Sequence, residues 1–226
     1  IARSASIHHQ MTTVFFSLEM SRTELAMRIL SAEGKISMGR LKKGDLDTEG
    51  WTNLATLQGR IDSAPLFIDD SPNMTLMEIR AKCRRLKQRN DLKLVVLDYL
   101  QLMSSGKKVE SRQQEVSEFS RSLKLLAKEL DVPVIALSQL NRGSEQRTDK
   151  RPMVSDLRES GSIEQDADMV ILLHREDMYN PDSQRVGEAD MIIAKHRGGP
   201  TRTIPLAFSG KFSRFNNMAN EAPPQY

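Results

Sequence analysis

The chain has 226 residues, of which 38% are hydrophobic and 28% are charged. This balance excludes collagen-like and low-complexity chains and provides enough apolar residues for a sizeable core. The net charge of +3 is compatible with binding a polyanion, but many ordinary enzymes share it. No apolar run approaches the roughly 18 residues of a membrane-spanning helix, and Cys83 is the only cysteine, so we expect no membrane segment and no internal disulfide.

The first residues of the chain, Ile1 to His9, carry neither a starting Met nor a signal-peptide pattern. They look like the end of a helix that is already under way. We therefore expect a fragment whose natural start lies upstream.

Five short runs of β-branched or apolar residues predict strands. In chain order they are residues 12–17, 66–69, 92–98, 131–138 and 168–173. Apolar residues at helical spacing fill the intervals, and two capping boxes, Ser21 to Glu24 and Thr75 to Glu78, mark helix starts. Trp51 lies on the apolar face of a predicted helix, so we expect it to pack into the core.

Later segments depart from this alternation. The polar residues 106–115 are predicted to form a mobile loop, and the apolar run Met169–Leu173 is predicted to form one buried strand. Towards the end of the chain, successive paired strands are predicted at residues 191–194, 201–208 and 211–215.

Strands that alternate with helices are typical of βαβ units. We therefore predict an α/β fold, with a mostly parallel sheet, helices on both of its faces and an antiparallel C-terminal extension. The sequence shows no internal repeat and no linker, so residues 1–215 are predicted to form one domain and residues 216–226 a tail.

Polar side chains follow three of the predicted strands, at the edge where open parallel sheets bind ligands. Glu19, Asp98 and Gln139 lie just beyond these strands. Each alone is commonly a helix cap or a rim residue, but together they suggest nucleotide hydrolysis, in which an Asp after an apolar strand holds Mg²⁺. The Gly-x-x-x-x-Gly-Lys-Ser/Thr phosphate-binding loop is absent from the sequence, and we expect it just upstream of Ile1.

Five motifs of the chain, in order and with plausible spacing, resemble those of the DnaB-family replicative helicases. The motifs are Phe16–Met20, Leu97–Gln101, Ser138–Arg142, Asp156–Gln165 and Lys195–Pro200. The family consists of hexameric RecA-like motors that act at bacterial replication forks. The resemblance runs from Ile1 to about Phe215, but the phosphate-binding loop and the family's amino-terminal collar domain are missing from this sequence.

The resemblance implies a RecA-like fold, the cofactors ATP and Mg²⁺, and roles for the three residues at the sheet edge. Glu19 would be the catalytic carboxylate that activates water. Asp98 would be the aspartate linked to Mg²⁺, usually through water, and Gln139 would be a catalytic sensor that couples the γ-phosphate to the DNA side.

Two further clusters take their roles from the resemblance. Arg158, Glu159 and Gly161 would lie in the loop that touches the phosphates of single-stranded DNA, a kind of contact that carries no base information. Lys195 and Arg197 would be basic fingers that reach the γ-phosphate of a neighbouring subunit. Their spacing of two in a strand end predicts that both point to one face, and His196 to the other.

The resemblance also implies a function: ATP-driven 5′-to-3′ movement on single-stranded DNA by a cytoplasmic homohexamer at the replication fork, with primase and a helicase loader as partners. This fragment is expected to be inactive without its phosphate-binding loop. Two alternatives stay open. One is a RecA-like recombinase or clock-type ATPase, which the motifs Asp156–Gln165 and Lys195–Pro200 disfavour; the other is a nucleotide-independent DNA-binding or protein-docking module.

Overall fold

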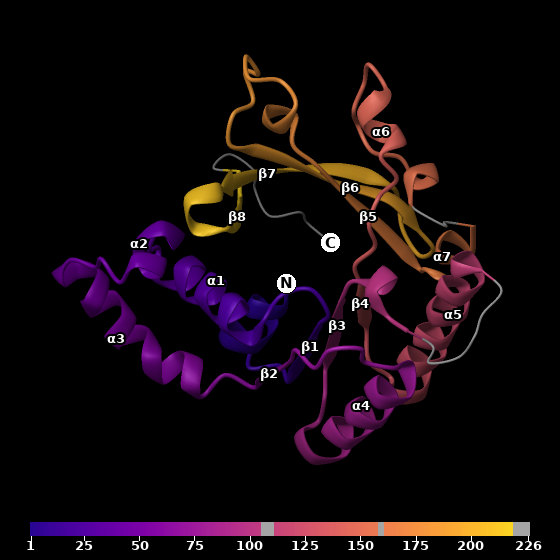
Figure 1. The fold of residues 1–226 in the computed structure, drawn as a ribbon, viewed down its shortest axis with the longest axis horizontal. Coiled ribbons are helices and arrows are strands. Elements are labelled where there is room, and N and C mark those ends of the chain that lie inside the picture. The colour runs from indigo at the N-terminus through magenta and orange to yellow at the C-terminus, as the bar shows by residue number, and fades with distance from the viewer. Residues whose placement is uncertain (105–110, 158–160, 219–226) are drawn as a thin grey trace.

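The computed structural model describes residues 1–104, 111–157 and 161–218, and its strands form two four-stranded sheets (Figure 1). The parallel sheet consists of β1 (Thr13–Ser17), β2 (Leu66–Asp69), β3 (Leu94–Asp98) and β4 (Val134–Ala136), in the order β2-β1-β3-β4. The antiparallel sheet consists of β5 (Met169–His174), β6 (Glu188–His196), β7 (Arg202–Ser209) and β8 (Arg214–Asn217), in that order. The predicted α/β fold with an antiparallel extension is therefore confirmed.

Seven α-helices accompany the strands in the described part of the chain. They are α1 (Arg22–Gly34), α2 (Met38–Lys43), α3 (Thr48–Asp62), α4 (Leu76–Asn90), α5 (Arg112–Leu130), α6 (Gly143–Gln146) and α7 (Gly161–Asp166). One π-helical turn and four 3₁₀ turns are also described, at Ser4–His8, Leu100–Leu102, Val154–Asp156, Glu176–Met178 and Gly210–Phe212. Helices α1 to α3 gather at one side of the molecule, and α4 and α5 at another (Figure 1). No helix in the described ranges is long and apolar enough to cross a bilayer.

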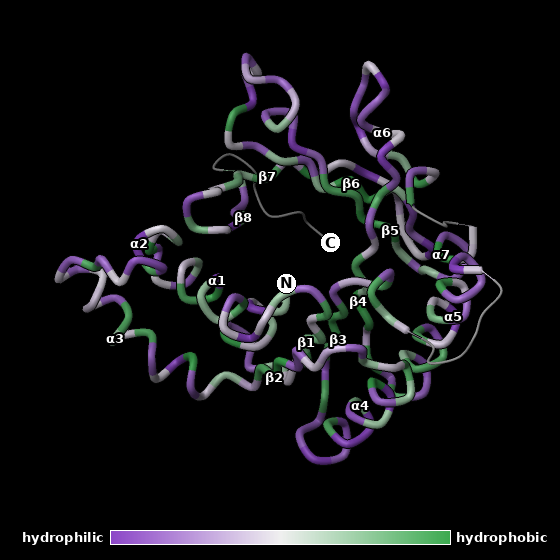
Figure 2. The backbone as a smooth tube through the Cα atoms, in the orientation of Figure 1, coloured by the Kyte–Doolittle hydropathy of each residue, from purple (hydrophilic) through white to green (hydrophobic). Residues whose placement is uncertain are grey.

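Helices cover both faces of the parallel sheet. Successive residues of a strand point to opposite faces, so each face has its own side chains to pack against a helix. Val14 and Phe16 of β1 belong to the main core, which also contains residues of α4 and α5: Ile79, Cys83, Phe119 and Leu123. Phe15, between them, lines a small hollow with Leu25 and Ile29 of α1 on the opposite face. Hydrophobic residues concentrate along β3, β5 and β6 (Figure 2). Cys83 is fully buried in this core, and burial raises the pKa of its thiol to about 12.

Both predicted capping boxes are present. The backbone N–H of Ser21 donates to Glu24 over 3.0 Å, and that of Thr75 donates to Glu78 over 2.8 Å. In return, the Ser21 and Thr75 hydroxyls accept the backbone N–H groups of the two glutamates. These reciprocal bonds satisfy N–H groups that a helix start leaves without partners, which is why the short motifs identified the starts of α1 and α4.

The prediction that Trp51 packs into the core is wrong, because its side chain is 58% exposed. Trp51 lies in the first turn of α3, which packs mainly against α1 at the edge of the molecule. Leu57 is the buried apolar residue of this helix. The periodicity identified the helix, but not which of its turns are packed against the rest of the fold.

Strand β5 is also less buried than predicted. Val170 and Leu172 are 6% and 3% exposed, whereas Met169, Ile171 and Leu173 are 41%, 41% and 55% exposed. Among the described strands β5 pairs only with β6, and its alternate side chains point away from the core. The apolar run therefore predicted the strand correctly, but the prediction that the whole strand is buried is wrong.

Several predicted boundaries differ from the structure; β6, for example, spans Glu188–His196 where residues 191–194 were predicted. Residues 106–110 of the predicted mobile loop lie outside the described residues, and the prediction is wrong for the rest of that loop because α5 begins at Arg112, after an N-cap at Ser111. Strand β4 has three residues, fewer than the predicted run 131–138. The last strand, β8, begins at Arg214 because a 3₁₀ turn precedes it.

Candidate nucleotide site

The register of β1 and β3 brings two predicted site residues to the same edge of the parallel sheet. Ser17 pairs with Asp98, and the backbone N–H of Leu18 donates to the Asp98 carbonyl over 2.7 Å. Glu19 follows immediately. Because the strands are parallel, both carboxylates emerge where β1 and β3 end.

The register of β3 and β4 adds Gln139 to this edge. Leu97 pairs with Ala136, and the N–H of Leu137 donates to the Leu97 carbonyl over 2.9 Å. Gln139 lies two residues beyond that bond and is exposed. The structure thus places all three residues predicted from strand ends beyond neighbouring strands of one sheet.

The charges of the two carboxylates are not balanced by ion pairs. Burial raises the pKa of Asp98, the nearby Glu19 charge raises it further, and Arg28 of α1 acts in the opposite direction. Neither carboxylate forms a hydrogen bond or an ion pair within the described residues. Hard divalent cations prefer carboxylate oxygens, so this pair of like charges fits a Mg²⁺ ion. The donor set therefore agrees with the cofactor that the sequence implied.

Gln101 is a residue of this edge that the sequence analysis did not single out. Its side-chain amide donates to the Ser138 hydroxyl over 2.9 Å, and its side-chain oxygen accepts the Gln139 backbone N–H over 3.2 Å. Arg112 donates to the Gln101 carbonyl over 2.7 Å, which holds the turn after β3. The signal in the sequence was a lone polar residue between Leu100 and Leu102, two apolar neighbours.

A second connection runs from the sheet edge towards the predicted DNA loop. Leu140 and Leu157 form an isolated antiparallel bridge, and the Asn141 N–H donates to the Asp156 carbonyl over 2.6 Å. The buried Asp156 carboxylate is held by two hydrogen bonds from Arg147, of 2.7 and 2.6 Å. The residues next to Gln139 therefore lie beside the residue that precedes Arg158.

Of the predicted DNA-contacting residues, Arg158 and Glu159 lie outside the described residues. Gly161 is described and is the first residue of α7. Helix α7 follows this loop and ends at Asp166. The DNA-contacting role of all three residues remains a prediction.

Lys195 and Arg197 lie at the end of β6, and both reach α7 of the same chain. Arg197 Nη2 donates to the Gln165 carbonyl over 2.6 Å, and Lys195 Nζ donates to the Glu164 carbonyl. His196 instead accepts the Gly198 N–H over 3.1 Å. Within the part of the chain that the structure describes, neither basic residue contacts Glu19, Asp98 or Gln139. A single subunit thus carries two separate groups of predicted site residues.

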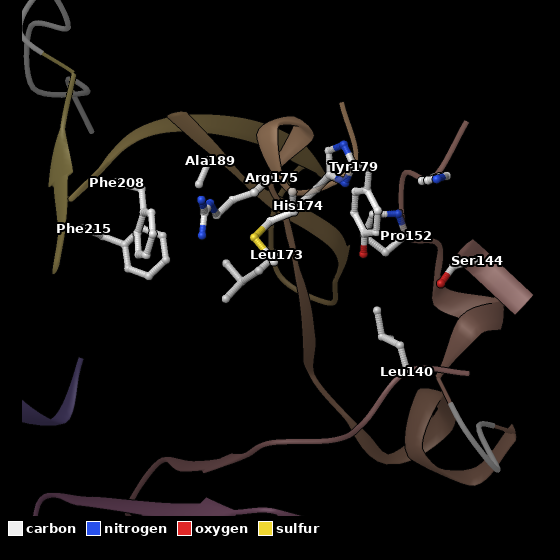
Figure 3. A pocket seen from close by; sticks show the side chains of 12 residues that line it. Leu140, Ser144, Pro152, Leu173, His174, Arg175, Tyr179, Ala189, Phe208 and Phe215 are labelled. Atoms are coloured by element: carbon white, nitrogen blue, oxygen red, sulfur yellow. The ribbon is translucent and has the colours of Figure 1, made fainter. Parts of the chain in front are cut away.

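A hollow of about 320 Å³ lies apart from both groups, between the antiparallel sheet and residues 140–152 (Figure 3). Phe208 and Phe215 lie at one end with ring centroids 4.9 Å apart, and His174 and Tyr179 stack at the other with centroids 6.1 Å apart. None of the residues predicted for the nucleotide or the DNA that the structure describes lines it. It is therefore not the predicted nucleotide site.

Comparison with known proteins agrees with this arrangement. A solved ATPase domain matches the chain with a TM-score of 0.92 and 41% identity, covering 96% of this chain and 78% of that one. A solved DnaB-like replicative helicase, whose structure describes its interactions with primase, also gives 0.92 and 41%, covering 96% of this chain and 52% of that one. The fold is therefore that of a RecA-like ATPase domain.

The sequence comparisons give the family. The family model described as DnaB-like helicase C terminal domain matches residues 1–217, and the chain belongs to this family. A replicative DNA helicase DnaB of Leifsonia xyli is 68% identical over 218 residues, or 96% of this chain and 48% of the relative. One of Mycobacterium intracellulare is 67% identical over 217 residues, or 96% and 38%. The chain spans about half the length of the first of these relatives, and less of the second.

Proposed function

We propose that this chain is the motor domain of an ATP-driven replicative DNA helicase, which moves along single-stranded DNA and unwinds the duplex at the replication fork. The observation that carries the proposal is the unpaired carboxylate pair, Glu19 and Asp98, at the edge of a parallel sheet. That edge occurs in a chain of the DnaB-like helicase C-terminal domain family.

In this proposal the sheet edge hydrolyses ATP. Glu19 accepts the proton of the attacking water, which its exposed and unpaired carboxylate is free to do. Asp98 would hold Mg²⁺, directly or through water, and the ion would supply positive charge against the phosphates. Gln139 lies beside them, with its backbone fixed by Gln101, and senses the γ-phosphate.

The DNA side of the proposal uses Arg158, Glu159 and Gly161. An arginine and backbone amides can bind phosphate oxygens of any sequence, as a translocating motor requires. The bridge between Leu140 and Leu157 gives a short path from Gln139 to this loop. A change at the γ-phosphate can therefore reach the DNA contacts through a few hydrogen-bonded residues.

Lys195 and Arg197 complete the active site of an adjacent subunit in a homohexamer. Their contacts with α7, away from Glu19, support a role in trans. Primase and a helicase loader are the partners that we propose for this cytoplasmic motor at bacterial replication forks. The solved relative whose structure describes interactions with primase supports the first of these partners.

The test compares this chain with a loop-containing protein, in which a segment bearing the phosphate-binding loop precedes Ile1. We expect the chain alone to bind ATP poorly and to hydrolyse it negligibly, because backbone amides and the lysine of that loop supply most contacts to the triphosphate. The loop-containing protein should hydrolyse ATP faster with single-stranded DNA and unwind a forked duplex. Robust ATP turnover by the chain alone would contradict the proposal.

Arg158→Ala in the loop-containing protein tests the DNA side. Affinity for single-stranded DNA should fall equally for different sequences, and the slope of log affinity against log salt should become shallower by roughly 0.7 per lost phosphate contact. A recombinase-type ATPase would hydrolyse ATP without unwinding the fork. A nucleotide-independent module would bind DNA with no response to ATP.

A further inference from the structure

The two basic residues at the end of β6 are held by the C-terminal end of α7. The last carbonyl groups of a helix lack partners within it and carry partial negative charge, so they favour cations. Lys195 uses the Glu164 carbonyl and Arg197 the Gln165 carbonyl. The Asp168 carboxylate lies 3.7 Å from the Arg197 guanidinium.

Asp168 connects this arrangement to the rest of the fold. Its backbone carbonyl accepts the Arg197 N–H over 2.9 Å, and its carboxylate pairs with Lys124 of α5. The hydrogen bond from Lys124 holds the pKa of Asp168 below its ordinary range, and the charges of Arg197 and Lys195 act in the same direction. Asp168 is therefore the acceptor that joins Arg197 to α5.

Helix α7 is itself fixed on α5. The Ser162 and Ser117 hydroxyls are 2.7 Å apart, and Ile163 is 8% exposed and belongs to the main core. Its first residue, Gly161, belongs to the predicted DNA loop, and its last turn carries the two carbonyl groups. One short helix thus has the DNA side at its start and the basic residues at its end.

The contacts leave Arg197 able to bind an anion. A guanidinium has five N–H donors, and the contacts within the described residues are with Gln165 and Asp168. The Arg197 side chain is 54% exposed. The acceptors on and after α7 therefore fix the direction of the guanidinium and leave some of its donors free.

We propose that Asp168 is a positioning residue, which together with the C-terminal carbonyls of α7 aims Arg197 and Lys195 at the nucleotide of an adjacent subunit. This inference rests on the proposed function, because it needs the two residues to act in trans. It also gives α7 a part in coupling, because a displacement of its start by bound DNA moves the acceptors that aim the basic residues.

The experiment is Asp168→Asn in the loop-containing protein. The amide keeps the size of the side chain and the backbone bond to Arg197, but it removes the charge that faces Arg197 and Lys124. Because small misplacements of a catalytic group are costly, kcat with single-stranded DNA should fall roughly ten- to a hundredfold. KM for ATP and affinity for DNA should not change, and Asp168→Glu should recover part of the rate.

Asp166→Asn is the matched control, since Asp166 is the last residue of α7 and forms no ion pair within the described residues. Thermal unfolding of both variants checks that the fold is intact. Wild-type kcat in Asp168→Asn, an equal loss in the control, or a loss of DNA affinity would overturn the positioning role. If Arg197→Ala in the same preparation kept normal hydrolysis, the proposed role in trans would fail, and this inference with it.

Discussion

At the edge of the parallel sheet, the Glu19 and Asp98 carboxylates lie close enough for their charges to interact, and neither has an ion pair within the described residues. At the end of β6 the opposite holds, because Lys195 and Arg197 are already held by carbonyl groups and Asp168. The first cluster has an excess of negative charge, with Asp98 half-buried and Glu19 exposed. The second is balanced by acceptors of its own chain.

This difference indicates which kind of ligand each cluster can bind. Two neighbouring carboxylates without ion pairs favour a cation, so the sheet edge is the cluster that we propose binds Mg²⁺ and the nucleotide. The basic residues already have acceptors in their own chain, and their remaining donors can bind an anion. The acidic cluster and the basic cluster lie in separate places on one chain. This separation fits the proposal that they form one active site between two subunits.

The largest effect on ATP hydrolysis is expected from substitutions in the basic cluster, Lys195 and Arg197. Arg197→Ala in the loop-containing protein should bind ATP but hydrolyse it about 10³- to 10⁵-fold more slowly, because an arginine finger stabilises charge on the γ-phosphate. Lys195→Ala should lose less, since an ammonium is a point charge and not a bidentate fork. Steady-state ATP hydrolysis measures both. Arg202→Ala, an exposed arginine that forms no ion pair within the described residues, is the control.

Mixing the two halves tests whether they meet between subunits. Rings that exchange subunits between Arg197→Ala and Glu19→Gln proteins contain interfaces in which an intact Glu19 meets an intact Arg197. Those interfaces should regain measurable hydrolysis. A structure of adjacent subunits with nucleotide, in which Arg197 lies far from the neighbour's γ-phosphate, would refute the role in trans.

The acidic half should give the next largest effect. Glu19→Gln in the loop-containing protein should keep ATP binding and lose hydrolysis roughly 10²- to 10⁴-fold, because an amide cannot accept the proton of the attacking water. Nucleotide binding and turnover are measured on the same preparation. Glu49→Gln makes the same chemical change on an exposed part of α3 and should have no effect. A Glu19→Gln protein that turns over normally would show that another group is the base.

The sequence predicted the sheet edge well because the information there is local. Each strand is a short apolar run, and parallel strands bring their ends together regardless of the helices between them. The capping boxes of α1 and α4 were predicted for the same reason, since donor and acceptor lie three residues apart.

The failures concern contacts between distant elements. Helical periodicity predicts an apolar face for α3, but whether Trp51 is covered depends on what packs there. The burial of β5 depends in the same way on its neighbours. The cap that α7 gives Lys195 and Arg197 joins residues 31 and 32 positions apart, and no local spacing reports it. Gln101 was missed because its partners lie on the far side of α5 in the chain.

Gln101 offers a smaller test of the acidic half. Gln101→Leu in the loop-containing protein removes both bonds to Ser138 and Gln139, each worth about 1 kcal/mol, so kcat should fall by up to about thirtyfold with little change in KM. Gln101→Glu keeps the acceptor for the Gln139 N–H and should lose less. Gln113→Leu, on the exposed first turn of α5, is the control. Normal kcat in Gln101→Leu would show that Gln139 needs no support from this side chain.

The smallest expected effect is on stability. Unlike the substitutions above, which reduce activity, this one should stabilise the protein. Burial and Glu19 raise the pKa of Asp98 above that of an unfolded chain, so the folded state binds its proton more tightly. Above that pKa the charged carboxylate therefore destabilises the fold, and Asp98→Asn should increase the free energy of unfolding at pH 7. As the pH falls through the raised pKa, the wild-type carboxyl becomes neutral and the advantage of the variant should shrink.

Urea unfolding of the chain at several pH values measures this, with Asp45→Asn, an exposed aspartate without an ion pair in the described ranges, as the control. The same substitution should weaken the Mg²⁺ dependence of hydrolysis in the loop-containing protein. A variant less stable than wild type at pH 7 would mean that Asp98 is held by favourable contacts, and the contrast between the two clusters would be lost.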